Sequence, residues 1–240
     1  MKAVAVILIS SALLFGFTKK PGDRVLIFSL TKGYHHASIA DGITAIKLIG
    51  EKDGFQVDTT TNPAMFTDGN LKRYKALIFL SPTGSALFNA GQQQAFVKYI
   101  HKGGGFVGIH AATDCLYDWD WYGKLVGAYF LKHPKIQQAT IHVIDHQHPS
   151  TAALPDIWAH TDEWYNFKQL SNKIHVLMKV DETSYTGDPM DNNDPVAWYQ
   201  QFEGGRVFYT ALGHTSDDFT TDTLFIKHLT GGINYALGRK

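Results

Sequence analysis

The six residues Gly105–His110, GFVGIH, decide the fold of this chain. They form an apolar run that follows two glycines, at 103 and 104, and ends in a histidine. A short apolar run bounded by turn residues is typical of a strand that is buried on both faces of a parallel sheet. We therefore expect a central strand here, with a strand-to-helix turn at His110.

Similar apolar runs lie upstream and downstream of this strand. RVLIFSL at 24–30, KALIFL at 75–80 and RVFYTAL at 206–212 each predict a further buried strand. Each of these runs is followed by a polar loop, and two of those loops contain histidine. The sequence thus predicts several strands whose ends present polar side chains.

Helical segments separate the predicted strands. Apolar residues at helical spacing predict a helix over 39–49, and further helices are expected over 92–101 and 222–237. Strands that alternate with helices build right-handed βαβ units. The predicted fold class is therefore α/β, flavodoxin-like, with a mostly parallel open sheet and helices on both faces. The less regular part of the chain, about 130–200, predicts some added antiparallel strands. The remaining expected elements are a strand at 55–59, a helix at 118–131, and strands at 136–144, 160–167, 174–180 and 196–202.

The composition describes a globular protein without a strong charge preference. Of 240 residues, 44% are hydrophobic and 18% charged, and 22 Lys and Arg balance 22 Asp and Glu. A net charge of zero removes the general electrostatic argument for a nucleic-acid partner or an anionic membrane surface. Cys115 is the only cysteine, so an intrachain disulfide and a cysteine-based metal site are both excluded.

The N-terminus resembles a targeting segment. Lys2 precedes the apolar run Ala3–Phe17, which is shorter than the roughly 20 residues of a membrane span. Residues 1–20 are therefore predicted to be a signal peptide, with an uncleaved N-terminal anchor as the alternative. Residues 21–240 are expected to form a single domain that is exported to the periplasm or secreted.

Three strand ends deliver histidines. In open α/β sheets, ligands bind beyond the carboxyl ends of the strands. The loop after the first strand contains Tyr34, His35 and His36, the central strand ends at His110, and His214 follows the last strand. The loop residues can also be explained as polar caps, and His110 as a buried histidine bonded to the main chain. Histidines at three separate strand ends favour a functional site over these structural explanations.

Carboxylates accompany these histidines. Asp114 is interpreted either as a turn residue or as a site residue, and Glu163 as a general acid or base. If 160–165 is a strand, His160 and Asp162 share one face. The same segment is also compatible with an irregular loop over the site.

The resulting hypothesis assigns each residue a role. The predicted catalytic residues are His110, His214, Glu163 and Asp114. The predicted substrate contacts are Tyr34, His35, His36, His160 and Trp198. No cofactor is assigned; a divalent metal is the candidate, and its ligands would come from His35, His36, His110, His160 and His214. The other histidines are expected to be exposed or structural.

The sequence resembles the ThuA-like family, named for trehalose utilisation. The stretches that carry the resemblance are TKGYHHASI (31–39), GGGFVGIHAATD (103–114), WYGKLVGAYFLKHP (121–134), HTDEWYNF (160–167) and DPVAWYQQFEGGRVFYTALGH (194–214). The resemblance implies a fold similar to class I glutamine amidotransferases. In those enzymes a cysteine occupies the strand-to-helix elbow, and a histidine and a glutamate follow a late strand.

Here His110 stands at that elbow, His214 matches the late histidine, and Asp217 or Asp218 falls near the glutamate. Cys115 lies five residues past the elbow. Glutamine thioester chemistry requires a thiolate, so amidotransferase activity is excluded.

The resemblance also implies a small-molecule carbohydrate as the partner. We expect sugar or keto-glycoside processing, with His110 or Glu163 as a base and with His214, His35 or a metal as the electrophile. One alternative is a non-catalytic carbohydrate-binding protein, and another is a structural module of the same fold. No nucleic acid and no membrane apart from the N-terminal segment are expected, and a homo-oligomer is left open.

Overall fold

The computed structural model of the chain describes residues 22–187 and 194–239. The predicted signal peptide or anchor, residues 1–20, lies outside them. Within the described residues, no helix has both the length and the apolar character that crossing a membrane requires.

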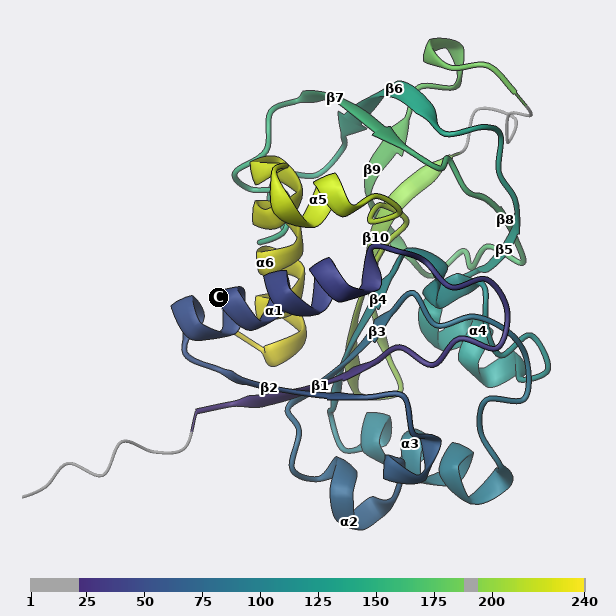
Figure 1. The fold of residues 1–240 in the computed structure, drawn as a ribbon, viewed down its shortest axis with the longest axis vertical. Coiled ribbons are helices and arrows are strands. Elements are labelled where there is room, and N and C mark those ends of the chain that lie inside the picture. Colours follow the sequence, from purple (N-terminus) through teal and green to yellow (C-terminus); the bar gives the residue numbers. More distant parts are fainter. Residues whose placement is uncertain (1–21, 188–193, 240) are drawn as a thin grey trace, which may run out of the picture.

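A nine-stranded sheet forms the centre of the protein, in the order β2-β1-β3-β4-β11-β10-β9-β6-β7 (Figure 1). The first five strands in this order run parallel to one another. They are β1 (Arg24–Phe28), β2 (Gln56–Thr60), β3 (Ala76–Leu80), β4 (Gly105–Ile109) and β11 (Gly205–Thr210). Four antiparallel strands extend the sheet: β10 (Pro195–Phe202), β9 (His175–Val180), β6 (Gln137–Val143) and β7 (Ile157–Asp162).

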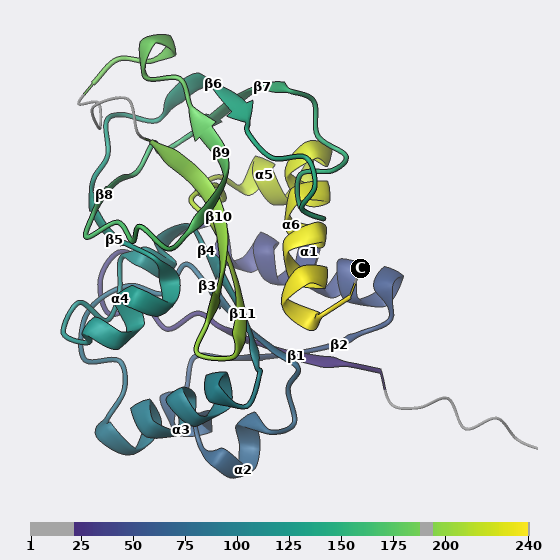
Figure 2. The same cartoon turned by 180° about the vertical axis from the view of Figure 1, so that it is seen from behind.

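Helices cover both faces of the parallel part (Figures 1 and 2). One face carries α1 (Ile39–Asp53), α5 (Ser216–Thr220) and α6 (Thr223–Leu237). The other carries α2 (Asp68–Leu71), α3 (Ala90–His101) and α4 (Asp120–Val126). Short 3-10 turns lie at Pro63–Met65, His110–Thr113 and Glu182–Ser184. The predicted α/β fold with added antiparallel strands is confirmed.

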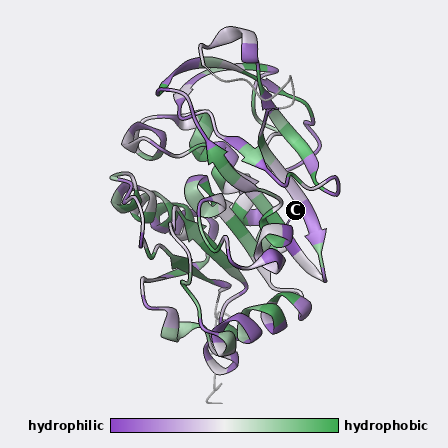
Figure 3. Ribbon diagram, turned by 90° about the vertical axis from the view of Figure 1, so that its right-hand side faces the viewer, coloured by the Kyte–Doolittle hydropathy of each residue, from purple (hydrophilic) through white to green (hydrophobic). Residues whose placement is uncertain are grey.

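The core lies where the apolar runs predicted it. Every residue of β3 and β4 is buried, and hydrophobic residues dominate the central strands (Figure 3). Phe79 of β3 packs against Phe96 of α3 and Phe106 of β4, with ring centroids 5.4 and 5.1 Å apart. Burial of such aromatic surface is the main favourable term in folding, and it fixes these strands as a rigid platform for the loops at their ends.

The region around residues 118–131 differs from the prediction of one helix. The helix α4 ends at Val126, because Gly127 adopts a left-handed conformation with φ 103°. The chain then forms β5 (Tyr129–Lys132), which pairs with β8 (Asn166–Lys168) in a separate two-stranded sheet. This pairing also divides the predicted strand 160–167: β7 ends at Asp162, and residues 163–165 form an irregular connection. Long-range pairing overrode the local helical pattern here.

The parallel strands direct their carboxyl ends to one edge of the sheet. β4 lies between β3 and β11, so the residues that follow β4 and β11 are neighbours. The loop that follows β1 is attached to this edge by a main-chain bridge between Thr31 and Thr83. The three histidine-containing loops of the sequence thus lie at the same edge.

Candidate functional site

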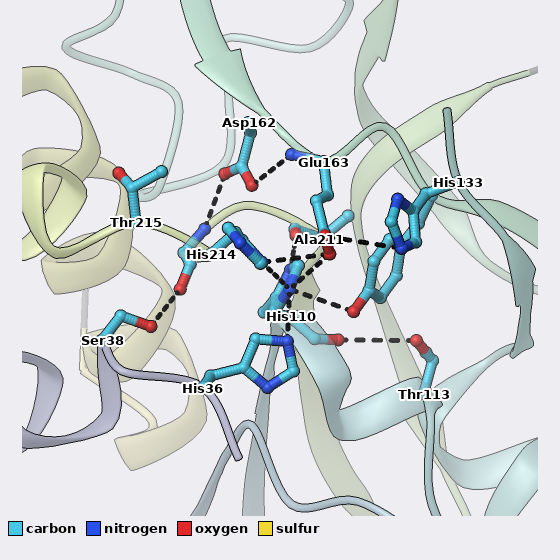
Figure 4. Close-up of polar contacts among 12 residues, drawn as sticks. His36, Ser38, His110, Thr113, His133, Asp162, Glu163, Ala211, His214 and Thr215 are labelled. Carbon is cyan, nitrogen blue, oxygen red and sulfur yellow. Dashed lines mark hydrogen bonds and ion pairs between the residues drawn. The ribbon is translucent and has the colours of Figure 1, made fainter. Parts of the chain in front are cut away.

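Four side chains from four separate loops converge at this edge (Figure 4). His36 follows β1, His110 follows β4, Glu163 follows β7 and His214 follows β11. One nitrogen from each imidazole and one carboxylate oxygen lie within 4.8 Å of one another. The structure therefore brings together His110, His214 and Glu163, three of the four predicted catalytic residues, and adds His36.

His110 is at the centre of this group. Its backbone has a φ of 49°, in the left-handed region that a non-glycine residue occupies at a cost of about 1–3 kcal/mol. This conformation produces the tight elbow between β4 and the following 3-10 turn. The elbow turns the imidazole towards β11, where Nδ1 donates a hydrogen bond to the carbonyl oxygen of Ala211 at 2.7 Å. With the proton on Nδ1, neutral His110 has its lone pair on Nε2.

Several polar groups crowd around this lone pair. His110 Nε2 lies 3.1 Å from His36 Nε2, 3.2 Å from His214 Nδ1 and 3.0 Å from the hydroxyl of Tyr165. It lies 3.5 Å from Glu163 Oε2. One lone pair accepts one good hydrogen bond, so these groups cannot all be satisfied by His110 alone.

Glu163 is the anionic member of the group. Its Oε2 lies 3.0 Å from His214 Nδ1, and its Oε1 lies 3.4 Å from His133 Nε2. Burial alone would raise the pKa of Glu163, but His110 and His214 outweigh burial and hold that pKa well below its usual range. Burial likewise opposes protonation of His214, whereas Glu163 raises its pKa overall. Glu163 is therefore a carboxylate at neutral pH.

His36 is the neutral member of the group. Burial, reinforced by the neighbouring His110 and His214, lowers the pKa of His36 to about 3. Its Nδ1 is buried without a hydrogen-bond partner among the described residues. A neutral imidazole, and not an imidazolium, is the form that binds a metal ion.

The spacing of these donors fits one divalent ion. Two ligands about 2.0–2.1 Å from a zinc-sized ion are roughly 3.0 Å apart at a right angle and roughly 3.4 Å apart at a tetrahedral angle. The nitrogen of His110 is 3.1 and 3.2 Å from those of His36 and His214, and the nitrogen of His214 is 3.0 Å from the Glu163 oxygen. Three imidazoles and a carboxylate suit zinc and other first-row divalent metals. The residues present can hold a metal.

A half-exposed aromatic and imidazole rim surrounds the group. Tyr34 is 66% exposed, and its ring contacts His36 edge-on at 4.8 Å. The side chain of His133 is 37% exposed, and its ring stacks on Tyr165 at 6.0 Å. The sequence reasoning missed His133, which was interpreted as exposed or structural because it follows no buried parallel strand. His133 follows β5 directly, and only the long-range pairing of β5 with β8 brings it close to Glu163.

The structure places other predicted site residues away from this centre. His35 is exposed and contacts the hydroxyl of Thr31 at 3.1 Å. Asp114 is half-buried and accepts a hydrogen bond from the Tyr117 hydroxyl at 2.6 Å, and burial raises its pKa. Trp198 was predicted to contact substrate, but its side chain is fully buried and donates to the carbonyl oxygen of Val126 at 2.8 Å. That ring is part of the core because β10 is an internal strand of the sheet.

Two further residues have different neighbours from those expected. His160 was predicted to contact substrate, but it is buried in a second cluster with Asp162 and Asp218. Asp218, which with Asp217 was expected near the position of the amidotransferase glutamate, contacts His160 at 3.2 Å, and the carboxylate that pairs with His214 is Glu163.

Cys115, five residues past the elbow, lies in the core and not at the candidate site. Its thiol is buried and lies 3.5 Å from the hydroxyl of Tyr122. Burial raises the pKa of this thiol far above its usual value. A thiolate does not form there at neutral pH.

Comparison with known proteins agrees with this architecture. The family model described as ThuA, trehalose utilisation, matches residues 24–236. The chain belongs to the ThuA family. Membership suggests a carbohydrate-related role. Among curated proteins, no sequence matches the chain significantly.

Solved structures support the same assignment at the level of the fold. A ThuA-like protein from Bacteroides uniformis is 24% identical, with 90% of this chain and 92% of that chain covered and a TM-score of 0.73. A ThuA-like protein from Parabacteroides merdae is 18% identical, with 92% and 91% covered and a TM-score of 0.71. A GMP synthase component from Thermoplasma acidophilum is 9% identical, with 90% and 95% covered and a TM-score of 0.55. The predicted ThuA-like recognition and glutamine amidotransferase-like fold are confirmed.

Proposed function

We propose that this ThuA family member is an exported enzyme that processes sugars or keto-glycosides at a divalent metal centre. One observation carries the proposal: ring nitrogens of His36, His110 and His214 and an oxygen of Glu163 converge within 4.8 Å. His110 Nε2 lies 3.1 and 3.2 Å from the nitrogens of His36 and His214, which is the spacing of ligands on one ion, and the main chain holds His110 in the tautomer that binds a metal. Trehalose utilisation, the description of the family, supports a carbohydrate as the substrate.

The metal and the protein would divide the chemistry between them. A bound divalent ion supplies Lewis-acid polarisation of a substrate oxygen. The protein orients that oxygen and moves the proton. His133 is the group best placed to exchange a proton with a substrate, because its imidazole is partly exposed and lies 3.4 Å from Glu163. Proton abstraction next to a carbonyl of a keto-glycoside needs this pairing of a base with an electrophile.

Aromatic side chains near the centre support a sugar as the ligand. Tyr34 is largely exposed and contacts His36, and the half-buried Phe130 packs on Tyr165 at 4.3 Å. Aromatic faces pack well against the apolar faces of pyranose rings, while hydroxyl groups remain free to reach polar partners. Since the side chains of Glu163 and His214 are 10% and 13% exposed, a ligand would reach the centre from their side.

Metal analysis combined with turnover tests the proposal. The purified protein should contain or take up one equivalent of a divalent metal, and His110→Ala should lose it. The wild type should turn over at least one member of a keto-glycoside panel, and chelation should abolish this activity until metal is restored. His142→Ala is a matched control, because His142 lies on β6, is 44% exposed and pairs only weakly with Asp181 at 3.9 Å.

The results separate the alternatives. No turnover with added zinc, manganese, iron or cobalt would contradict an enzyme. Sugar binding that survives His110→Ala would instead favour a non-catalytic carbohydrate-binding protein. Export rests on the apolar run Ala3–Phe17. Fractionation of cells that express the full chain, compared with a chain that starts at residue 21, tests that part.

A further inference from the structure

A second buried cluster lies beside the candidate metal centre. His160 of β7 is 5% exposed, and both of its ring nitrogens face carboxylates. Nε2 lies 3.4 Å from Asp162 Oδ2 and 3.2 Å from Asp218 Oδ1, and Nδ1 lies 3.2 Å from Asp222 Oδ2. Carboxylates only accept hydrogen bonds, so both ring nitrogens donate and the ring is an imidazolium.

The other contacts of Asp162 reach directly into the candidate metal centre. Its Oδ1 accepts the main-chain N–H of Glu163 at 2.7 Å, and its Oδ2 accepts the N–H of Gly213 at 2.9 Å. One aspartate therefore ties together the main chain of Glu163 and the residue before His214. Figure 4 shows Asp162 between these two ligand-bearing segments.

Asp218 fixes the main chain on the C-terminal side of His214. Its Oδ2 accepts the N–H of Thr215 at 2.8 Å. His214 thus lies between two peptide groups, at Gly213 and Thr215, whose N–H groups are each bonded to an aspartate of the cluster. The carbonyl oxygen of Gly213 is also held, by the hydroxyl of Ser38 at 3.0 Å.

One imidazolium and several main-chain N–H groups stabilise the three carboxylates of the cluster. Asp222 is the N-cap of α6 and accepts the N–H groups of Leu224 and Phe225, and Asp218 closes the capping box of α5. Main-chain N–H groups and helix N-termini favour carboxylates. Burial opposes a charge on His160, but the three aspartates raise its pKa to about 11. The imidazolium completes a network in which the buried groups are satisfied.

The candidate metal centre requires contacts that fix the distance between Glu163 and His214, because these two ligands follow strands that are not neighbours in the sheet. Glu163 follows β7, the edge strand, whereas His214 follows β11, and β10, β9 and β6 lie between these two strands. β7 and β11 therefore do not pair directly, and the distance between the two ligands is not set by a ladder shared by their own strands. Gly213 has a φ of 113°, a conformation that glycine adopts readily. Because glycine permits many conformations, the hydrogen bonds of the loop must fix its shape.

We infer that His160 is a positioning residue, whose buried cation fixes Asp162 and Asp218 and, through them, the main chain of Glu163 and His214 at the separation that a shared metal ligand set requires. The metal part of this inference rests on the proposed function, whereas the positioning of the main chain does not. In this role His160 acts through its two aspartates and not by touching a substrate.

Two measurements on His160→Gln test the inference. Hydrogen exchange by NMR on the metal-free protein should show the amides of Glu163, Gly213 and Thr215 exchanging at least tenfold faster than in the wild type. Co²⁺ titration should show an affinity loss of about 10–100-fold, as is usual for outer-shell partners, together with a changed ligand-field spectrum. His228→Gln is the control, since His228 is fully buried and, among the described residues, its ring forms a hydrogen bond only with the carbonyl oxygen of Ser150.

The outcomes are distinct. Unchanged exchange at all three amides in folded His160→Gln, or equal changes in His228→Gln, would overturn the inference. If the wild type binds no Co²⁺, the proposed metal centre fails, while the exchange data still decide the positioning role. If His160→Gln does not fold, Asp218→Asn takes its place. Faster exchange at Thr215 and Gly213 in that variant supports the inference, and unchanged exchange there contradicts it.

Discussion

The Nδ1 atom of His110 lies 2.7 Å from the carbonyl oxygen of Ala211, just beyond the end of the neighbouring strand β11. A carbonyl oxygen only accepts, so this short contact places the ring proton on Nδ1. The lone pair of Nε2 then points at the position where His36, His214 and Glu163 converge. The parallel pairing of β4 with β11 therefore determines the chemical form of the central histidine.

The first prediction concerns this tautomer. In the metal-free protein at pH 8, neutral His110 should be in the Nδ1–H form. Ring ¹⁵N chemical shifts report the tautomer directly. A dominant Nε2–H form would contradict the expected geometry, because that proton would occupy the lone pair on which metal binding depends. Addition of Zn²⁺ should shift the Nε2 resonance and leave the Nδ1–H intact.

The second prediction concerns Tyr165, whose hydroxyl lies 3.0 Å from Nε2 of His110. In the metal-free protein this hydroxyl donates to the same lone pair that a metal would use. Tyr165→Phe should therefore bind Zn²⁺ or Co²⁺ about 2–10-fold more tightly, which corresponds to the loss of one competing hydrogen bond of about 0.5–1.5 kcal/mol. Competition titration measures this change. Weaker binding in the variant would show that Tyr165 supports the metal centre instead of competing with it.

Much of the candidate site was predictable because parallel strands present their carboxyl ends at one edge. That rule selected His35, His36, His110 and His214 from twelve histidines in the chain, without distinguishing His35 from His36. Glu163 was selected because a carboxylate can act as an acid or base. Its position in the site depends on the antiparallel strands β10, β9, β6 and β7, whose order in the sheet the sequence did not predict. His133 was missed because the β5–β8 pairing is long-range. The surroundings of His160 were not predictable, since spacing in a strand does not reveal that three aspartates surround its ring.

The third prediction concerns the pH dependence of stability through His160. The folded state raises its pKa from 6.5 to about 11, so between these values the folded state binds more protons than the unfolded state. This contribution to the free energy of unfolding is fully present below about pH 6.5 and is lost as the pH rises towards 11, by about 1.4 kcal/mol for each pH unit.

Urea denaturation of wild type and His160→Gln between pH 6 and pH 10 measures this contribution as a difference. The stability advantage of the wild type should be constant near pH 6 and decrease steadily above it. His228→Gln should show no such decrease relative to wild type over the same range. A difference that stays flat up to pH 10 would mean that His160 is not an imidazolium in the folded protein.

The last prediction concerns Trp198, whose indole is fully buried in β10 and donates to the carbonyl oxygen of Val126 at 2.8 Å. Trp198→Phe removes this hydrogen bond and leaves a small cavity, so we expect a stability loss of about 1–3 kcal/mol by urea denaturation. The affinity for Co²⁺ should stay within twofold of the wild type, because the ring contacts Phe167 and Tyr209 and not the candidate ligands. Trp121→Phe is the matched control: this half-buried indole donates to Glu203 near the surface and should cost less than about 1 kcal/mol. A folded Trp198→Phe protein with unchanged stability and weakened sugar binding would instead place this ring against the substrate.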